Sequence, residues 1–146
     1  MTNNTERSVK QVIVIDRSKG TNIGKYVSQG AHASLGALLK MSSIRKYPDE
    51  RTKITFDFEE NSILDKWLNG IFTKICLSAS SEEEMVSIYD AISRYNETAD
   101  EKIPVVLIED CGKTCFDGVK TKTAVGIGPF WSDIIDNFTG HLKLFR

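Results

Sequence analysis

The sequence has no run of about 18 apolar residues, the length that a membrane-spanning helix requires. Its first residues are polar and lack the apolar stretch of a secretory signal. We therefore expect a cytoplasmic protein without a membrane span, in which residues 1–9 form a flexible lead-in. The chain has 146 residues, 40% of them hydrophobic and 27% charged, and no internal repeat. This composition predicts one globular domain, residues 10–146.

Cysteine and histidine are scarce. The three cysteines, Cys76, Cys111 and Cys115, are odd in number and follow no signal sequence, which indicates free thiols in a reducing cytosol. Cys111 and Cys115 would supply two ligands of a zinc site, but the two histidines are distant in the sequence. We therefore expect no metal, and read the cysteines as small residues that fill space.

An excess of charge of one sign is also lacking, because the formal net charge is -1. This excludes a broadly cationic surface that coats nucleic acid. It does not exclude a local basic patch, because acidic residues cluster elsewhere, for example at Glu82, Glu83 and Glu84. The net charge alone therefore says little about partners.

Hydrophobic patterning predicts strands that alternate with helices. The predicted strands cover residues 11–15, 72–77, 104–108 and 121–127, and the predicted helices cover 23–41, 61–69, 81–95 and 131–138. The charged segment 42–55 is expected to be an exposed loop or insertion. The order βααβαββα predicts an α/β fold in one domain, with a four-stranded mixed sheet flanked by helices on both faces.

The first predicted helix is rich in small residues, which favours close packing against the sheet. Steps of about 100° per residue place Val27, Ala31 and Leu35 on one face of this helix. Lys25 and Gln29 then lie on the opposite face. In the third helix, Ser81 is the predicted N-cap, with Glu84 completing a capping box.

Gly112-Lys113-Thr114 invites comparison with a phosphate-binding P-loop. That motif requires another glycine five positions earlier, where this chain has Leu107, and it should open a helix. Here the following residues, Cys115 to Gly118, read instead as a hairpin-like return. The sequence therefore argues against hydrolysis of nucleoside triphosphates.

Asp110 is the stronger candidate, because it directly follows an apolar strand. Ligands of α/β proteins bind at the carboxyl ends of strands, although a turn aspartate that caps the next loop is the alternative. Lys25 taken alone reads as a solvated lysine, His32 reads as a supporting residue more often than a catalyst, and His141 is ambiguous. Three stretches, 24–33, 108–114 and 139–145, each place a lysine beside a glycine and a hydroxyl or imidazole group. That combination suits a phosphate-bearing ligand.

Together these stretches resemble the type 2 peptidyl-tRNA hydrolase family of archaea and eukaryotes. The first helix of that family carries Gly-Lys followed by Gln and His, which here are Gly24-Lys25, Gln29 and His32. Cys111 stands where the family usually has alanine. Asn22-Ile23 stands where it usually has a further lysine step, for which Lys19 is a candidate substitute. The other family motifs are Asp110-Cys111-Gly112-Lys113-Thr114, Gly126-Ile127-Gly128-Pro129 and Thr139 to Leu144.

The resemblance implies an enzyme that hydrolyses the ester between peptide and tRNA in peptidyl-tRNA, with no metal and no other cofactor. It implies that Asp110 orients or deprotonates a water molecule beside Lys25. Lys25 or the Thr114 hydroxyl would stabilise the oxyanion, an effect of about 3 kcal/mol per donor in known enzymes. Gln29 would position the ester or the water, and His32 would support the site.

For the tRNA we expect electrostatic contacts that are largely blind to sequence and weaken with salt. The candidate substrate-binding residues are Lys19, Gly112, Lys113, His141 and Lys143, together with the N-terminus of the first helix. Two other functions stay open: a non-catalytic module that binds tRNA or protein, and a hydrolase of a related aminoacyl-tRNA ester. The sequence also leaves open whether Phe130 and Trp131 pack in a homodimer or inside the domain.

Overall fold

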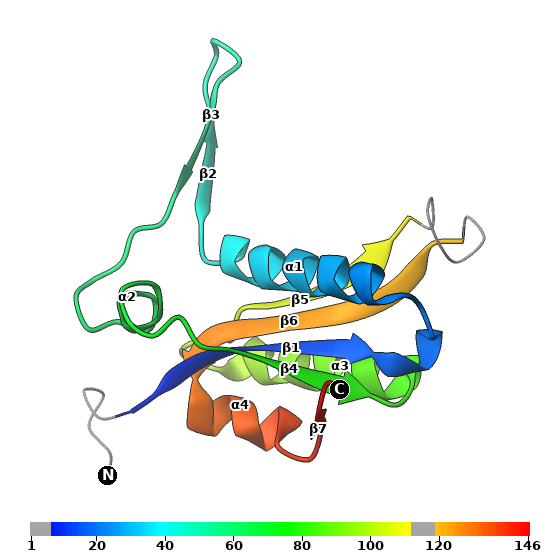
Figure 1. Cartoon of the computed structure of the whole chain (residues 1–146). Coiled ribbons are helices and arrows are strands. Elements are labelled where there is room, and N and C mark those ends of the chain that lie inside the picture. The colour runs from blue at the N-terminus through cyan, green and yellow to red at the C-terminus, as the bar shows by residue number, and fades with distance from the viewer. Residues whose placement is uncertain (1–6, 112–118) are drawn as a thin grey trace.

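Five strands form a central mixed sheet in the order β5-β6-β1-β4-β7 (Figure 1). The computed structural model describes residues 7–111 and 119–146. β1 and β4 are parallel, and the other neighbouring pairs are antiparallel. The strands are β1 Val9–Asp16, β4 Lys74–Ala79, β5 Val105–Asp110, β6 Thr121–Trp131 and β7 Lys143–Leu144, and a separate hairpin pairs β2 Ser43–Lys46 with β3 Thr52–Thr55.

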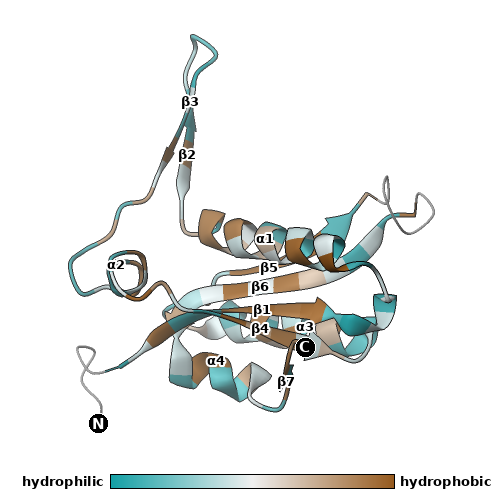
Figure 2. Ribbon diagram, in the orientation of Figure 1, coloured by the Kyte–Doolittle hydropathy of each residue, from teal (hydrophilic) through white to brown (hydrophobic). Residues whose placement is uncertain are grey.

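Helices cover both faces of the sheet (Figure 1). The side chains of β1 alternate between two apolar clusters: Ile13 and Ile15 pack with α1, whereas Val12 and Val14 pack with α3 and α4. Figure 2 shows β1 as a strongly hydrophobic strand between these helices. The helices are α1 Ile23–Leu39, α2 Ile63–Leu68, α3 Glu82–Thr98 and α4 Ser132–Thr139, and a short 3-10 helix, η1 Arg17–Lys19, joins β1 to α1.

The α/β class and the mixed sheet are confirmed, but the expected four strands and the order βααβαββα are wrong. β7 adds a fifth strand at the edge of the sheet, where Leu144 pairs with Leu77 of β4. Two residues are too short for any periodicity, which is why the sequence did not predict this strand. Segment 42–55 contains the β2–β3 hairpin, whose strand residues are all exposed and so carry no alternation of burial.

The face of α1 that carries Val27, Ala31 and Leu35 points away from the sheet. Val27 and Leu35 are 68% and 58% exposed, whereas Gln29 is buried. The reason lies in Gly126 of β6, where a Cβ atom would overlap the carbonyl group of Ala33. The helix therefore rests on the backbone of β6 through its small residues, and the branched side chains point away.

Phe130 and Trp131 are 1% and 4% exposed and pack inside the domain. Both lie on β6, which continues past Gly128-Pro129 instead of ending at Ile127 as the sequence suggested. Within the described ranges, no helix is long and apolar enough to cross a membrane.

Candidate active site

Three elements meet at one corner of the domain (Figure 1). Their polar side chains come together there. β5 ends at Asp110, which pairs with Thr121 at the start of β6. Beside them α1 begins, and the side chain of its N-cap residue Asn22 accepts a hydrogen bond from the Lys25 amide at 2.8 Å. The cap thus fixes Lys25 in the first turn of the helix.

Lys25 and Asp110 form an ion pair in this corner. The Nζ atom of Lys25 lies 2.6 Å from Oδ2 of Asp110, and the two side chains are only 15% and 7% exposed. Gln29, one turn further along α1, donates a hydrogen bond from Nε2 to the same oxygen at 2.6 Å. An opposite charge at this distance favours the charged form of both groups. One helix therefore supplies both a cation and an amide to the carboxylate.

Thr123 on β6 fixes the orientation of the Gln29 amide. A carboxylate only accepts hydrogen bonds, so the NH₂ group of Gln29 must face Asp110 and the amide oxygen must face away from it. Thr123 donates its hydroxyl hydrogen to that oxygen at 2.5 Å, and both side chains are buried, 3% exposed for Thr123 and 1% for Gln29. Lys25, Asp110, Gln29 and Thr123 form one connected network, here called the ester-site cluster after the bond that the sequence resemblance implies.

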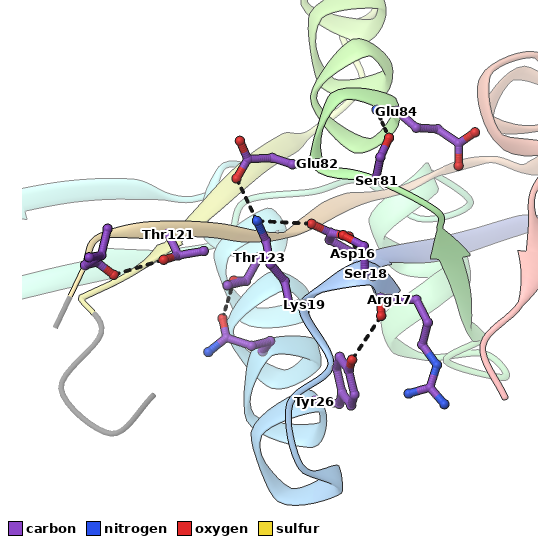
Figure 3. Close-up of polar contacts among 12 residues, drawn as sticks. Asp16, Arg17, Ser18, Lys19, Tyr26, Ser81, Glu82, Glu84, Thr121 and Thr123 are labelled. Atoms are coloured by element: carbon purple, nitrogen blue, oxygen red, sulfur yellow. Dashed lines mark hydrogen bonds and ion pairs between the residues drawn. The ribbon is translucent and has the colours of Figure 1, made fainter. Parts of the chain in front are cut away.

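A second set of charges lies next to the ester-site cluster, at the carboxyl end of β1. Asp16 is fully buried and accepts hydrogen bonds from the amide and hydroxyl groups of Ser18 at 2.9 and 2.6 Å. Figure 3 shows Lys19 between Asp16 and Glu82, with its Nζ atom 3.4 and 3.0 Å from their carboxylate oxygens. Burial lowers the pKa of Lys19, but the hydrogen bond to Glu82 and the charge of Asp16 outweigh it and raise the pKa. Two carboxylates therefore already balance this ammonium group.

The predicted site residues His32, His141 and Lys143 do not join the ester-site cluster. His32 is exposed on the outer face of α1. His141 precedes β7, on which Lys143 lies, and β6, β1 and β4 separate this strand from β5. At about 4.8 Å per strand, that separation is about 19 Å. The predicted site residues Gly112, Lys113 and Thr114 lie outside the described residues, as does the hairpin-like return at 115–118.

The C-terminal motif Thr139 to Leu144 has a structural role. The hydroxyl group of Thr139 donates to the Ile135 carbonyl at 3.2 Å, and the amide of Leu142 donates to the Thr139 carbonyl at 3.0 Å. The amide of Phe145 then donates to the Cys76 carbonyl on β4 at 3.0 Å. These bonds turn the chain from α4 into β7 and attach it to the sheet.

Sequence reasoning missed two residues near the site, Thr123 and Asp16. A signal for Thr123 was present, because Thr121 and Thr123 alternate with two lysines along a strand and so face the opposite side. Asp16 carried the same signal as Asp110, because it directly follows the predicted strand at 11–15, but it reads as the first residue of a polar loop. Its burial follows from its place as the last residue of β1, the middle strand of the sheet.

The ester-site cluster has the components of an acid–base site: a carboxylate that can accept a proton, and a cation and an amide that hold it. Among residues 7–111 and 119–146, no group of three His, Cys, Asp or Glu side chains lies close enough to hold a metal ion. The arrangement suits hydrolysis of an activated acyl bond, because a fixed carboxylate orients water and a fixed cation stabilises developing negative charge.

Comparison with known proteins agrees with this chemistry. The family model described as "Peptidyl-tRNA hydrolase PTH2" matches residues 9–145. A peptidyl-tRNA hydrolase of Methanocaldococcus jannaschii is 35% identical over 136 residues, which covers 93% of this chain and 99% of the relative. One from Aeropyrum pernix is 32% identical over 142 residues, with 97% and 99% covered. A probable peptidyl-tRNA hydrolase 2 of Dictyostelium discoideum is 30% identical over 136 residues, 93% of this chain and 54% of that longer protein.

Proposed function

The chain belongs to the peptidyl-tRNA hydrolase PTH2 family, and from this premise we propose that it hydrolyses the ester bond between peptide and tRNA in peptidyl-tRNA. The single observation that carries the proposal is the contact of Lys25 with Asp110 at 2.6 Å, made in a nearly buried corner of the domain. A protein that merely bound tRNA would have no need to hold the carboxylate at the end of β5 with both a lysine and a buried glutamine.

Asp110 is the residue that activates water in this proposal. The carboxylate accepts a proton from a water molecule, whose oxygen attacks the ester carbonyl carbon. The tetrahedral intermediate then collapses, the bond to the ribose oxygen breaks, and that oxygen takes up a proton. Lys25 keeps the carboxylate charged and lies close enough to stabilise the oxyanion, with the Thr114 hydroxyl as its proposed partner.

Gln29 and Thr123 position this machinery. Because Thr123 holds the amide oxygen of Gln29, the amide NH₂ group keeps Asp110 in one orientation. Pre-organised donors of this kind need no rearrangement as charge develops during the reaction. His32, two turns beyond Lys25 on the exposed face of α1, is assigned a supporting role toward the bound substrate.

The tRNA is bound electrostatically in this proposal. Gly112 and Lys113, two and three residues after Asp110 in the sequence, are assigned to the phosphate nearest the ester, and His141 and Lys143 to the RNA backbone further away. Lys19 differs from the other lysines, because its charge is balanced by Glu82 and Asp16. We assign Lys19 to shaping the edge of the site more than to attracting phosphate. The protein acts in the cytoplasm and without a metal in this proposal.

The test is a hydrolysis assay with N-acetyl-aminoacyl-tRNA, which mimics the blocked amino group of a peptide. Wild type should release tRNA, Asp110→Ala should not, and Asp90→Ala, an exposed aspartate on α3, should match wild type. Binding of tRNA without any release by wild type would favour the non-catalytic module. Equal cleavage of unblocked aminoacyl-tRNA would favour the broader esterase.

A further inference from the structure

The β2–β3 hairpin projects from the body of the domain at the C-terminal end of α1 (Figure 1). Every residue of both strands is exposed, and the hairpin forms a sheet of its own. A two-stranded hairpin in water is marginally stable at best. Residues that destabilise such a hairpin further therefore indicate that its exposed face serves a ligand.

One face of the hairpin nevertheless carries cations that repel one another. Arg45 lies directly opposite Lys53, an arrangement that destabilises a strand pair. Tyr47 follows two residues after Arg45 on the same face, and the guanidinium groups of Arg45 and Arg51 lie 4.9 and 5.4 Å from the centre of its ring. Asp49 pairs with Arg51 at 2.7 Å, but both side chains are more than half exposed, so this pair contributes little. We call the face of Arg45, Tyr47, Arg51 and Lys53 the basic hairpin face.

An excess of positive charge extends along the sequence from the hairpin back to the ester-site cluster. Between Arg17 and Pro48 the chain contains six Lys or Arg residues and no Asp or Glu, although its net charge is -1. Lys19 and Lys25 are paired with carboxylates of other elements. Within the described parts of the chain, Lys40, Arg45 and Lys46 form no ion pair. Uncompensated positive charge thus lies at the C-terminal end of α1 and on the hairpin.

The distance between the two ends of α1 limits what can bind at both. The helix has 17 residues, which at about 1.5 Å per residue gives a length of about 25 Å. A mononucleotide or a short peptide held at the ester-site cluster could not reach the hairpin. A folded RNA carries phosphates over such a distance, and its exposed bases stack on aromatic rings and guanidinium groups.

We propose that the basic hairpin face is a second RNA contact, which holds the body of the tRNA along α1 while its 3′ end lies at the ester-site cluster. This inference rests on the proposed function for the identity of the ligand, but its evidence is separate from the catalytic residues. The contact is to phosphate and stacked bases, so it reads no specific sequence. The other face of the hairpin presents the apolar pair Ile44 and Ile54, 63% and 50% exposed, which provides a control.

The test compares three double variants in binding deacylated tRNA, which requires no hydrolysis. Arg45→Ser with Lys53→Ser removes the opposed cations and relieves their repulsion, so the hairpin should stay folded. Arg94→Ser with Lys102→Ser removes two exposed cations outside the hairpin, which controls for net charge. Ile44→Ser with Ile54→Ser changes the opposite face. The Kd for tRNA is measured by titration between about 50 and 200 mM salt.

Of the three double variants, only Arg45→Ser with Lys53→Ser should weaken the binding of tRNA. Each phosphate contact accounts for about a 3-fold change in Kd over this range of salt. Losing two contacts should therefore raise Kd about 10-fold at the lowest salt concentration and make Kd depend less steeply on salt. The kcat/KM for full-length N-acetyl-aminoacyl-tRNA should fall by the same factor, and the loss should vanish with a short 3′-terminal fragment of the same ester. An equal loss in the Arg94 and Lys102 variant would overturn the proposal. So would a loss only in the isoleucine variant, which would assign the hairpin to a different partner.

The two proposals fail in different ways in this experiment. If wild type cleaves no ester but its tRNA affinity depends on Arg45 and Lys53, the hairpin contact stands and the proposed hydrolysis fails. If wild type cleaves the ester and the hairpin variant binds and cleaves like wild type, the reverse holds.

Discussion

The two ends of α1 differ in how tightly the charged side chains around them are held. At its N-terminal end, Lys25 and Gln29 reach a buried carboxylate at 2.6 Å, and further hydrogen bonds hold the network. At its C-terminal end, the β2–β3 hairpin stands exposed, with Arg45 opposite Lys53 and no buried partner for either among the described residues. Chemistry requires fixed distances, whereas capture of a long polyanion requires only charge in roughly the right place.

The energetic cost of placing a charged side chain at each end of α1 differs in the same way. A carboxylate as buried as Asp110 is strongly disfavoured unless cations and donors compensate it, so each partner at that end matters. Charges on the hairpin stay hydrated and are screened by salt, so each contributes little and the contributions add. Substitutions at the two ends should therefore differ in size and in kind.

The largest effect is expected from Lys25→Met at the N-terminal end. This variant keeps most of the side-chain volume but removes the charge beside Asp110, so kcat/KM for N-acetyl-aminoacyl-tRNA should fall by about 100-fold or more. Lys40→Met, just past the last residue of the same helix, should lower it by less than about 3-fold. Similar losses in both variants would erase the distinction between the two ends.

A smaller but clear effect is expected on the packing of α1 over the sheet. Gly126→Ala would force a methyl group into the Ala33 carbonyl and should destabilise the fold by about 2 kcal/mol in chemical denaturation. Gly30→Ala is the matched control, because its added atom would lie 3.8 Å from Ile15, an ordinary contact. It should stabilise the helix by up to about 1 kcal/mol. A tolerated Gly126→Ala would mean that α1 does not rest on β6 as closely as described.

Thr123→Val should lower kcat by about 10-fold with little change in KM. The variant removes the donor to the Gln29 amide oxygen, which leaves a buried group unsatisfied and the amide free to turn from Asp110. Thr121→Val is the control, because the Thr121 hydroxyl donates to the Val119 carbonyl and not to Gln29. Steady-state kinetics on both variants measures the difference. A rise in KM alone would assign Thr123 to binding.

The smallest effect is expected from Glu82→Gln, beside the ester-site cluster. Lys19 has a raised pKa, so the folded protein holds this proton more tightly than the unfolded chain does. The resulting stability is complete below the ordinary lysine value of 10.5 and is lost as the pH rises through the folded pKa.

Glu82→Gln should therefore cost about 0.5 kcal/mol near pH 8, and the cost should shrink only as the pH rises above 10.5. Glu83→Gln, in the same first turn of α3, controls for the effect of charge on the helix end. A cost that is independent of pH would exclude the pairing with Lys19 as its source.

The sequence predicted the elements that local chemistry determines. The buried strand at 11–15 became β1, and Ser81 caps α3 as expected, accepting a hydrogen bond from the Glu84 amide at 3.1 Å. The capping box is displaced by one residue, because the Glu84 carboxylate accepts from the amide of Ser80 at 3.0 Å. Short-range patterns were sufficient for these features.

Features that depend on long-range packing were not predicted. The orientation of α1 follows from the approach of Ala33 to Gly126, which no pattern within the helix reveals. β7 forms because Leu144 pairs with Leu77 of β4 at the open edge of the sheet. Thr123 joins the site only because β6 lies beside β5. The resemblance to a family identified Lys25, Gln29 and Asp110 as site residues. The residues around them could be identified only from the fold.

The most direct test of the account is the single-turnover rate of Asp110→Asn at saturating enzyme, measured with the Kd of the same variant for deacylated tRNA. Asparagine keeps the shape of the side chain and cannot accept a proton from water. The account predicts a Kd within about 2-fold of wild type and a rate at least about 100-fold lower. A wild-type rate, or a loss explained wholly by weaker binding, would contradict the claim that this carboxylate drives water onto the ester.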